Sequence, residues 1–427
     1  MTNHAHSTLE TAVEAGAEPV GSDEHIAPVP RVSIQAFCET VEAAAAIQAA
    51  GEDRRMAKAH LKIQLGGLTA AAEAYRSAPT PNVIILETES HGQDIIASLD
   101  SLAEVCDSGT RVVVIGKHND VVLYRELVRR GVSDYLIAPI SPIDMVRSIS
   151  GLFAATDAKP VGRTIAVVGA KGGVGASTIA HNIGWSIAHD LALDSVITDL
   201  DLPFGTAGLD YNQDPPQGIA DAVFSPDRID HAFVDRLLSK CTDHLSLLAA
   251  PATLERAYDF GTEAFDAIYD ALRISMPCIV LDVPHQWNDW TRHTLVSADE
   301  ILIVATPDLA NLRNAKNLFD FLRTARVNDH RPFYCLNQVG VPKRPEIKPA
   351  EFANALEDQP VAIIPFEPQV FGTAANNGQM IAEVPAGART AETFRKLAQL
   401  MTGRTESKKS KGGLFHPVLK KLLKRQK

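Results

Sequence analysis

The 427-residue sequence is poor in cysteine, has no long apolar run, and carries a formal net charge of −11. Its five cysteines are scattered singly, without the Cys-x-x-Cys or Cys/His spacing of a zinc site, which favours reduced thiols in a cytosolic protein. No stretch of about eighteen apolar residues occurs, and the N-terminus lacks the basic and apolar regions of a signal peptide, so we expect neither membrane spanning nor secretion. The acidic balance argues against binding nucleic acid over the whole surface, and we expect no specific nucleic acid partner.

Composition and periodicity divide the chain into five segments. Residues 1–30 are rich in Ala, Glu and Pro, contain five acidic residues and no Lys or Arg, and predict a disordered acidic leader. Two series of alternating strands and helices follow, over residues 31–153 and 164–402, with a linker between them at 154–163. From residue 403 the composition becomes rich in lysine, which marks a separate basic tail over 403–427.

Short apolar runs of the kind that form buried parallel strands alternate with helical patterns in both series. In the first series the expected strands are Val32–Ala36, Val83–Leu86, Val112–Ile115 and Asp134–Ile137. In the second series they are Thr164–Val168, Ser195–Asp199, Leu245–Ala249, Cys278–Asp282, Glu300–Ala305, Phe333–Asn337 and Val361–Ile364. This alternation predicts the α/β class, with a flavodoxin-like first domain and a mostly parallel, helix-covered sheet in the second.

A glycine-rich turn after the expected strand Thr164–Val168 leads into a helical pattern, which is the context of a phosphate-binding loop. Glycines let consecutive backbone N–H groups curve around a phosphate, and the helix N-terminus adds its positive end. The loop residues are Lys171, Gly172, Gly173, Val174, Gly175, Ala176, Ser177 and Thr178. The Ser177 hydroxyl is placed to bind Mg²⁺; an ordinary strand–helix turn is the alternative interpretation.

This string resembles the deviant Walker A motif of the MinD/ParA family. The resemblance implies that Lys171 reaches the ATP of the partner subunit in a homodimer. Two positions depart from the general pattern: Ala170 replaces the first glycine, and Ala176 replaces the lysine that normally precedes the Ser-Thr pair. A charge-assisted hydrogen bond contributes roughly 1.5–3 kcal/mol, so its loss weakens ATP binding on the order of ten- to a hundredfold. Phosphoryl transfer should suffer at least as much, so the sequence favours binding over hydrolysis.

Acidic residues lie at the ends of two expected strands of the second domain, Asp199 and Asp201 at one and Asp282 at the other. Taken singly, an Asp at a strand end is more often a helix cap or a solvated loop residue than a functional one. In the order found in the MinD/ParA family, they imply that Asp199 lies near Mg²⁺ and the attacking water. Asp201 then belongs to a switch that senses the γ-phosphate, and Asp282 binds a Mg²⁺ water. Lys171 and Asp199 are the implied catalytic residues.

Asn337 ends the expected strand Phe333–Asn337. It matches the strand-end Asn that reads adenine in that family, and a plain turn Asn is the alternative.

The first domain resembles a response-regulator receiver domain whose reactive residues are missing. Glu87 stands at the position of the phosphorylated Asp, Gly116 at that of the hydroxyl residue, and Ala138 at that of the lysine before Pro139. No acidic pair follows the first expected strand. We therefore expect no phosphotransfer and a domain suited to docking or dimerisation, with a generic flavodoxin-like domain as the alternative.

The tail combines nine Lys and Arg residues and one Glu with an apolar stripe at helical spacing, and Pro417 is placed to start a helix. The stripe residues are Leu414, Phe415, Val418, Leu419, Leu422 and Leu423. Such a tail suits an anionic membrane surface or an acidic groove on a partner protein, and a merely solvated tail is the third possibility. In character it resembles the membrane-targeting helix of MinD.

A degenerate receiver domain followed by a MinD/ParA-like domain resembles the CpaE/TadZ proteins of bacterial Tad/Flp pilus assembly. The resemblance implies a cytoplasmic homodimer, peripherally associated with the inner membrane or a cell pole, that recruits pilus secretion components such as the motor ATPase. We expect a scaffold that responds to ATP and Mg²⁺ with weak or no hydrolysis. Two other classes stay open: an active ParA/MinD-type ATPase that partitions DNA or positions proteins, and a phosphorylation-driven response regulator.

Overall fold

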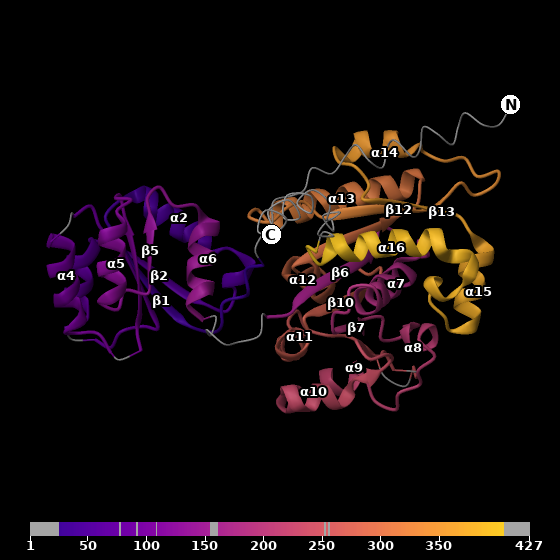
Figure 1. The fold of residues 1–427 in the computed structure, drawn as a ribbon, viewed down its shortest axis with the longest axis horizontal. Coiled ribbons are helices and arrows are strands. Elements are labelled where there is room, and N and C mark those ends of the chain that lie inside the picture. Colours follow the sequence, from indigo (N-terminus) through magenta and orange to yellow (C-terminus); the bar gives the residue numbers. More distant parts are fainter. Residues whose placement is uncertain are drawn as a thin grey trace, which may run out of the picture.

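The computed structural model describes residues 25–76, 78–90, 93–107, 109–153, 161–251, 253–254 and 257–404. They form two α/β domains, each built on its own sheet (Figure 1). This architecture confirms the predicted fold class. The predicted leader up to residue 24 and the tail from residue 405, including its apolar stripe, lie outside the described residues. Within the described part of the chain, no helix has both the length and the apolar character needed to cross a membrane.

The first domain has a five-stranded sheet in the order β2-β1-β3-β4-β5, with every neighbouring pair parallel. Its elements are β1 (Ser33–Cys38), α2 (Val41–Gly51), η1 (Arg54–Met56), β2 (His60–Leu65), α3 (Gly67–Ala74), β3 (Val83–Glu87), α4 (Gln93–Ala103), β4 (Arg111–Gly116), α5 (Val121–Arg129), β5 (Asp134–Ile137) and α6 (Pro142–Phe153). This strand order is that of flavodoxin-like folds.

Strand β2 was not among the predicted strands. It lies at the sheet edge, and its side chains are mostly exposed, so it lacks the continuous apolar run of a buried strand. The central strand β3, in contrast, is buried at all five positions. Helices α2 and α6 pack on one face of the sheet, and α3, α4 and α5 pack on the other.

The second domain has an eight-stranded sheet in the order β13-β12-β11-β6-β10-β7-β9-β8, antiparallel only between β8 and β9. Its strands are β6 (Arg163–Gly169), β7 (Ser195–Asp199), β8 (Ser239–Lys240), β9 (Leu245–Leu248), β10 (Cys278–Val283), β11 (Glu300–Ala305), β12 (Phe333–Val339) and β13 (Ala362–Pro365). Its α-helices are α7 (Ala176–His189), α8 (Ala207–Asp210), α9 (Ile219–Val223), α10 (His231–Leu237), α11 (Asp266–Ser275), α12 (Asp289–Ser297), α13 (Leu309–Ala325), α14 (Pro349–Leu356), α15 (Pro368–Asn377) and α16 (Ala388–Met401). The 3₁₀ turns are η2 (Pro226–Arg228), η3 (Ile381–Glu383) and η4 (Pro385–Gly387).

Alternation along the buried strands divides the core of this domain into two layers. Ile165 and Val167 of β6 pack toward α7 and α16, whereas Ala166 and Val168 pack toward the layer of α11, α12 and α13. Because the sheet is parallel around β6, the carboxyl ends of β6, β7, β10, β11 and β12 meet at one edge. The predicted nucleotide residues all come from this edge.

The predicted end of the leader at residue 30 is too late, because residues 25–30 belong to the folded first domain. The Val29 side chain is buried in the core, and its N–H donates to the Arg55 carbonyl at 2.8 Å. The Ser150 hydroxyl donates to the Ala27 carbonyl at 2.7 Å. A short extended segment with two Pro residues shows no periodicity, so its burial could not be predicted from the sequence.

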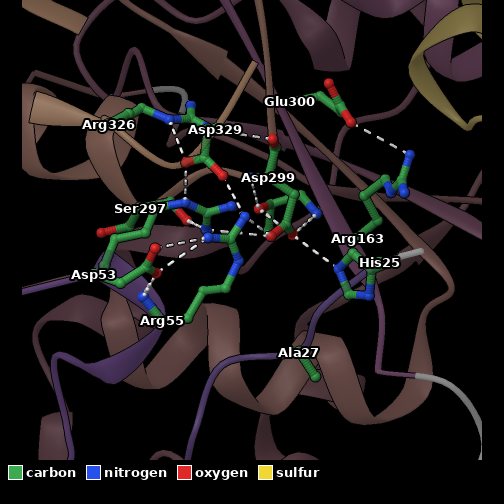
Figure 2. Close-up of polar contacts among 12 residues, drawn as sticks. His25, Ala27, Asp53, Arg55, Arg163, Ser297, Asp299, Glu300, Arg326 and Asp329 are labelled. Atoms are coloured by element: carbon green, nitrogen blue, oxygen red, sulfur yellow. Dashed lines mark hydrogen bonds and ion pairs between the residues drawn. The ribbon is translucent and has the colours of Figure 1, made fainter. Parts of the chain in front are cut away.

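A buried network of ion pairs joins the two domains (Figure 2). Arg54 of the first domain donates from Nε to Asp329 at 2.8 Å and from Nη1 to the Ser297 carbonyl at 2.9 Å. Its Nη1 also lies 3.3 Å from the Asp299 carboxylate, and Arg55 pairs with Asp329. The Arg54, Asp299 and Asp329 side chains are all less than a tenth exposed.

The second domain supplies further cations to the same carboxylates. Arg273 pairs with Asp299 at 2.9 Å, and Arg326 pairs with Asp329 at 2.9 Å. Burial alone raises a carboxyl pKa, but Arg54 and Arg326 outweigh it and lower the pKa of Asp329 to about 2. Asp299 also accepts from the Thr164 N–H at the start of β6. The network therefore holds the first domain against the amino ends of β6 and β11, at the opposite end of these strands from the predicted nucleotide edge.

Candidate nucleotide site

The predicted phosphate loop connects β6 to α7 at the centre of the sheet. Two of its glycines have left-handed backbone conformations, with φ of 79° at Gly173 and 86° at Gly175. A Cβ at Gly175 would lie 2.7 Å from Nδ2 of Asn337, so a larger residue would be both strained and crowded there. These backbone angles curl the chain into a concave turn at the N-terminus of α7.

Across the described residues, no protein acceptor takes the backbone N–H groups of residues 171–178, whereas the flanking Ala170 and Ile179 N–H groups are both bonded. None of these eight residues is a proline, so the loop offers consecutive free donors at a helix N-terminus. Such an arrangement binds anions, and phosphate oxygens fit it.

Polar side chains from three neighbouring segments hold the carbonyl groups of this loop. His285 Nδ1 donates to the Gly169 carbonyl at 2.9 Å, and Asn314 Nδ2 donates to the Ala170 carbonyl at 2.9 Å. Asn337 Nδ2 donates to the Val174 carbonyl at 2.8 Å. The sequence pattern did not reveal His285 and Asn314, because they lie over a hundred residues away along the chain.

The side-chain amide of Asn337, which is predicted to read adenine, already makes hydrogen bonds within the protein. Its Nδ2 is used by the loop, and its Oδ1 accepts from the Gln338 N–H at 2.8 Å. The side chain is almost fully buried. In this arrangement Asn337 positions the phosphate loop, and reading of adenine stays a prediction.

The charged and hydroxyl positions of the loop lie toward solvent. Lys171 is exposed, while Ala176, Ser177 and Thr178 are half-buried in the first turn of α7. Burial raises the pKa of the Asp308 carboxyl, but its hydrogen bonds outweigh burial and lower the pKa, and Lys171 adds a smaller lowering effect. Lys171 is exposed, and its predicted reach to the nucleotide of a partner subunit stays a prediction.

The predicted aspartates come together beside the loop. Asp199 ends β7 and Asp282 lies near the end of the adjacent β10, and both are buried. Asp199 accepts from the N–H groups of Asp201 and Ala207, each at 3.1 Å. Burial, and then the nearby Asp282 carboxylate, raise the pKa of Asp199.

Asp201 is placed differently from the two buried aspartates. It is half-buried on the loop after β7, and its Oδ1 accepts from the Phe204 N–H at 3.3 Å. The switch role of Asp201 stays a prediction.

The structure adds one buried residue that sequence reasoning missed. His181, on the second turn of α7, is fully buried, with Nδ1 2.6 Å from Asp210 and Nε2 3.3 Å from Asp282. The Nε2 contact is an ion pair, because the direction of the N–H bond is poor for a hydrogen bond to that oxygen. Burial lowers the pKa of His181, but the two carboxylates outweigh it and raise the pKa to about 10.

The receiver-like positions of the first domain are occupied by structural contacts. Glu87 accepts from the N–H groups of Glu39 and Thr40 at 2.8 Å each and from the Thr40 hydroxyl at 2.6 Å. These bonds tie the buried Glu87 carboxylate to the N-terminus of α2, which Thr40 also caps. A Cβ at Gly116 would collide with the Tyr135 hydroxyl, so Tyr135 fills the space beside Gly116.

Comparison with known proteins finds relatives of this chain. No family model matches the chain. A pilus assembly protein CpaE from Caulobacter crescentus is 46% identical over its whole solved chain and 31% of this chain, with a TM-score of 0.30. A CpaE2 pilus assembly protein from Sinorhizobium meliloti is 39% identical over its whole solved chain and 29% of this chain, with a TM-score of 0.28. Both match the N-terminal domain of this chain, and their sequence identity over the whole of each solved chain shows that this domain is related to CpaE proteins.

Curated proteins are similar to this chain as well. Septum site-determining protein MinD from Synechocystis sp. is 27% identical over 161 residues, which are 38% of this chain. The match spans 59% of that MinD, so this chain covers a little over half the length of the curated protein.

Proposed function

Because the chain belongs to the family of CpaE pilus assembly proteins, within the MinD/ParA superfamily, we propose that it is an ATP-binding localisation and assembly factor of a Tad/Flp-type pilus secretion system. It acts as a nucleotide-responsive dimeric scaffold with weak or no hydrolysis, and it recruits components such as the motor ATPase. The observation that carries the nucleotide part is the run of free N–H groups at residues 171–178.

The site fits Mg²⁺ as well as phosphate. The buried Asp199 and Asp282 carboxylates lie beside the loop, and carboxylate and hydroxyl oxygens are the ligands that Mg²⁺ prefers. Ser177 and Asp282 are the residues that would hold the ion, Ser177 directly and Asp282 through water. When bound, Mg²⁺ supplies positive charge to the phosphates. Ala176 supplies none, which supports binding without efficient turnover.

Exposed apolar side chains around this edge support dimerisation. Phe204, Leu254, Trp287 and Leu309 are each more than half exposed and lie on segments that follow β7, β9, β10 and β11. Large apolar side chains that are exposed at one edge of a sheet favour a protein contact there. A second copy that packs face to face against this edge would cover these side chains. Lys171 of each copy would then reach the nucleotide bound by the other copy.

Replacing Lys171 with alanine is expected to abolish ATP-dependent dimerisation. The lysine is exposed at the loop, and its loss removes a charge-assisted bond of roughly 1.5–3 kcal/mol at each of two equivalent sites. Sedimentation velocity with and without Mg-ATP measures the dimer fraction. The matched control is Lys240→Ala, since Lys240 is exposed in the same domain and pairs only with Asp243 among the described residues. Equal dimer fractions for Lys171→Ala and the wild type would exclude the nucleotide-switched dimer.

The basic tail is proposed to hold the protein at an anionic inner-membrane surface, peripherally and from the cytoplasm, with a polar position in the cell. Its nine basic residues are expected to contribute about 1 kcal/mol each when near such a surface. The full chain should therefore sediment with vesicles that contain anionic lipid and not with neutral vesicles. A chain ending at residue 404 should not sediment with either. If truncation leaves vesicle binding unchanged, the tail is not the membrane contact.

A further inference from the structure

His181 is a buried charged residue that the proposed nucleotide cradle does not use directly. It lies on α7, the helix that begins at Ala176, and it is enclosed between two carboxylates from different segments. Its Nδ1 is 2.6 Å from Asp210, the last residue of α8, and its Nε2 is 3.3 Å from Asp282 of β10. The Tyr211 hydroxyl donates to the His181 carbonyl at 2.6 Å. Every ring nitrogen of this histidine therefore faces an acidic group.

We propose that His181 is a positioning residue that clamps the Asp282 carboxylate to Asp210, and so fixes the loop between β7 and α8 against the phosphate-loop helix. The role of this clamp in Mg²⁺ binding rests on the proposed nucleotide function. The contacts of His181 with Asp210 and Asp282 do not depend on that function. His181 therefore places a positive charge of α7 against the Asp210 and Asp282 carboxylates. It lies five residues after Ala176, the position at which the phosphate loop lacks its usual lysine.

Two observations explain how the clamp acts on the metal-binding side of the site. Asp199 lies next to Asp282 in the sheet, and its carboxylate holds the N–H groups of Asp201 and Ala207 at both ends of the same loop. Asp210 follows three residues after Ala207 on α8. Asp199 therefore holds both ends of the loop that carries Asp201, and His181, which pairs with Asp210 and Asp282, holds the end of α8 that follows this loop.

The buried Asp199 and Asp282 carboxylates need a positive group such as His181 beside them. Asp199, Asp282 and His181 each offer an atom within 4.8 Å of the others, and all three side chains are buried. Carboxylates this close repel one another unless a positive group lies between them. Removing one member of a buried ion pair leaves the other charge uncompensated, which is strongly destabilising.

A double-mutant cycle tests the clamp without nucleotide. His181→Gln is expected to lower the Tm of the full chain by roughly 10 °C, and to lower it by less than half as much in an Asp210→Asn background. His189→Gln is the control, because His189 is exposed at the end of the same helix. If His181→Gln alone fails to fold, recovery of folding by Asp210→Asn supports the clamp. Equal Tm losses in the two backgrounds, or no recovery, would overturn it.

A fluorescent ATP analogue, measured with and without Mg²⁺, tests whether the clamp serves the metal side of the site. Residues that orient a metal-binding group change metal affinity about 10- to 100-fold. His181→Gln should therefore reduce the Mg²⁺-dependent gain in analogue affinity by roughly tenfold and leave the Mg²⁺-free affinity unchanged. An equal loss in both conditions would show packing alone and overturn the positioning role. If the wild type binds no analogue in either condition, the proposed nucleotide function fails, and the double-mutant cycle still decides the clamp.

Discussion

Replacing Arg54 with methionine is expected to lower the free energy of unfolding by about 3–5 kcal/mol, because Asp299 and Asp329 then lose a buried cation. Arg54 reaches both carboxylates and the Ser297 carbonyl from the first domain, and its side chain is only 7% exposed. Methionine keeps much of the apolar volume, so the effect comes from the uncompensated charge. Urea unfolding monitored by tryptophan fluorescence measures the change, since all three Trp residues lie in the second domain.

The control is Arg129→Met, because Arg129 pairs with Glu126 at the exposed surface of the first domain. We expect little change there, as exposed ion pairs contribute little. The pH dependence gives a second check. The pKa of Asp329 is lowered to about 2, so its contribution is present above the ordinary pKa of 3.8 and is lost as the pH falls toward 2. The Arg54→Met protein should lose less stability over that range, and equal acid sensitivity would contradict the assignment.

Replacing Ala176 with lysine is expected to tighten ATP binding on the order of ten- to a hundredfold. Ala176 is the first residue of α7, is half-buried, and lies within the run of free N–H groups at residues 171–178. A lysine at this position restores the charge that phosphate loops usually place there, and the phosphates gain a charge-assisted bond. Titration with labelled Mg-ATP measures the affinity of both proteins.

Ala176→Met is the matched control, since it adds a side chain of similar length without charge. It should leave the affinity unchanged or lower it. An ATPase assay on the same proteins adds a second readout, because the added lysine should raise turnover more than it raises affinity. If wild-type ATP affinity already equals that of Ala176→Lys, another group supplies the missing charge, and the argument from Ala176 is wrong.

Local sequence signals predicted the elements that are buried or tightly patterned. The runs at Val83–Leu86 and Thr164–Val168 form buried central strands because apolar side chains on both faces require burial. The exposed edge strand β2 and the packed segment at residues 25–30 carry no such signal, and both were missed. Their placement depends on neighbours that local sequence does not specify.

The phosphate loop illustrates the division between sequence and tertiary structure. The sequence alone identified this loop by its glycines, by Lys171 and by the absence of a lysine at Ala176, because backbone curvature and local charge depend on consecutive residues. Only the tertiary structure decided that His181 lies between Asp210 and Asp282, and that Arg54 joins Asp299 and Asp329. These contacts link residues far apart in the chain, which lie close together only because the strands and helices that carry them pack against one another. Burial then makes their pairing necessary, because a charge removed from water needs a partner.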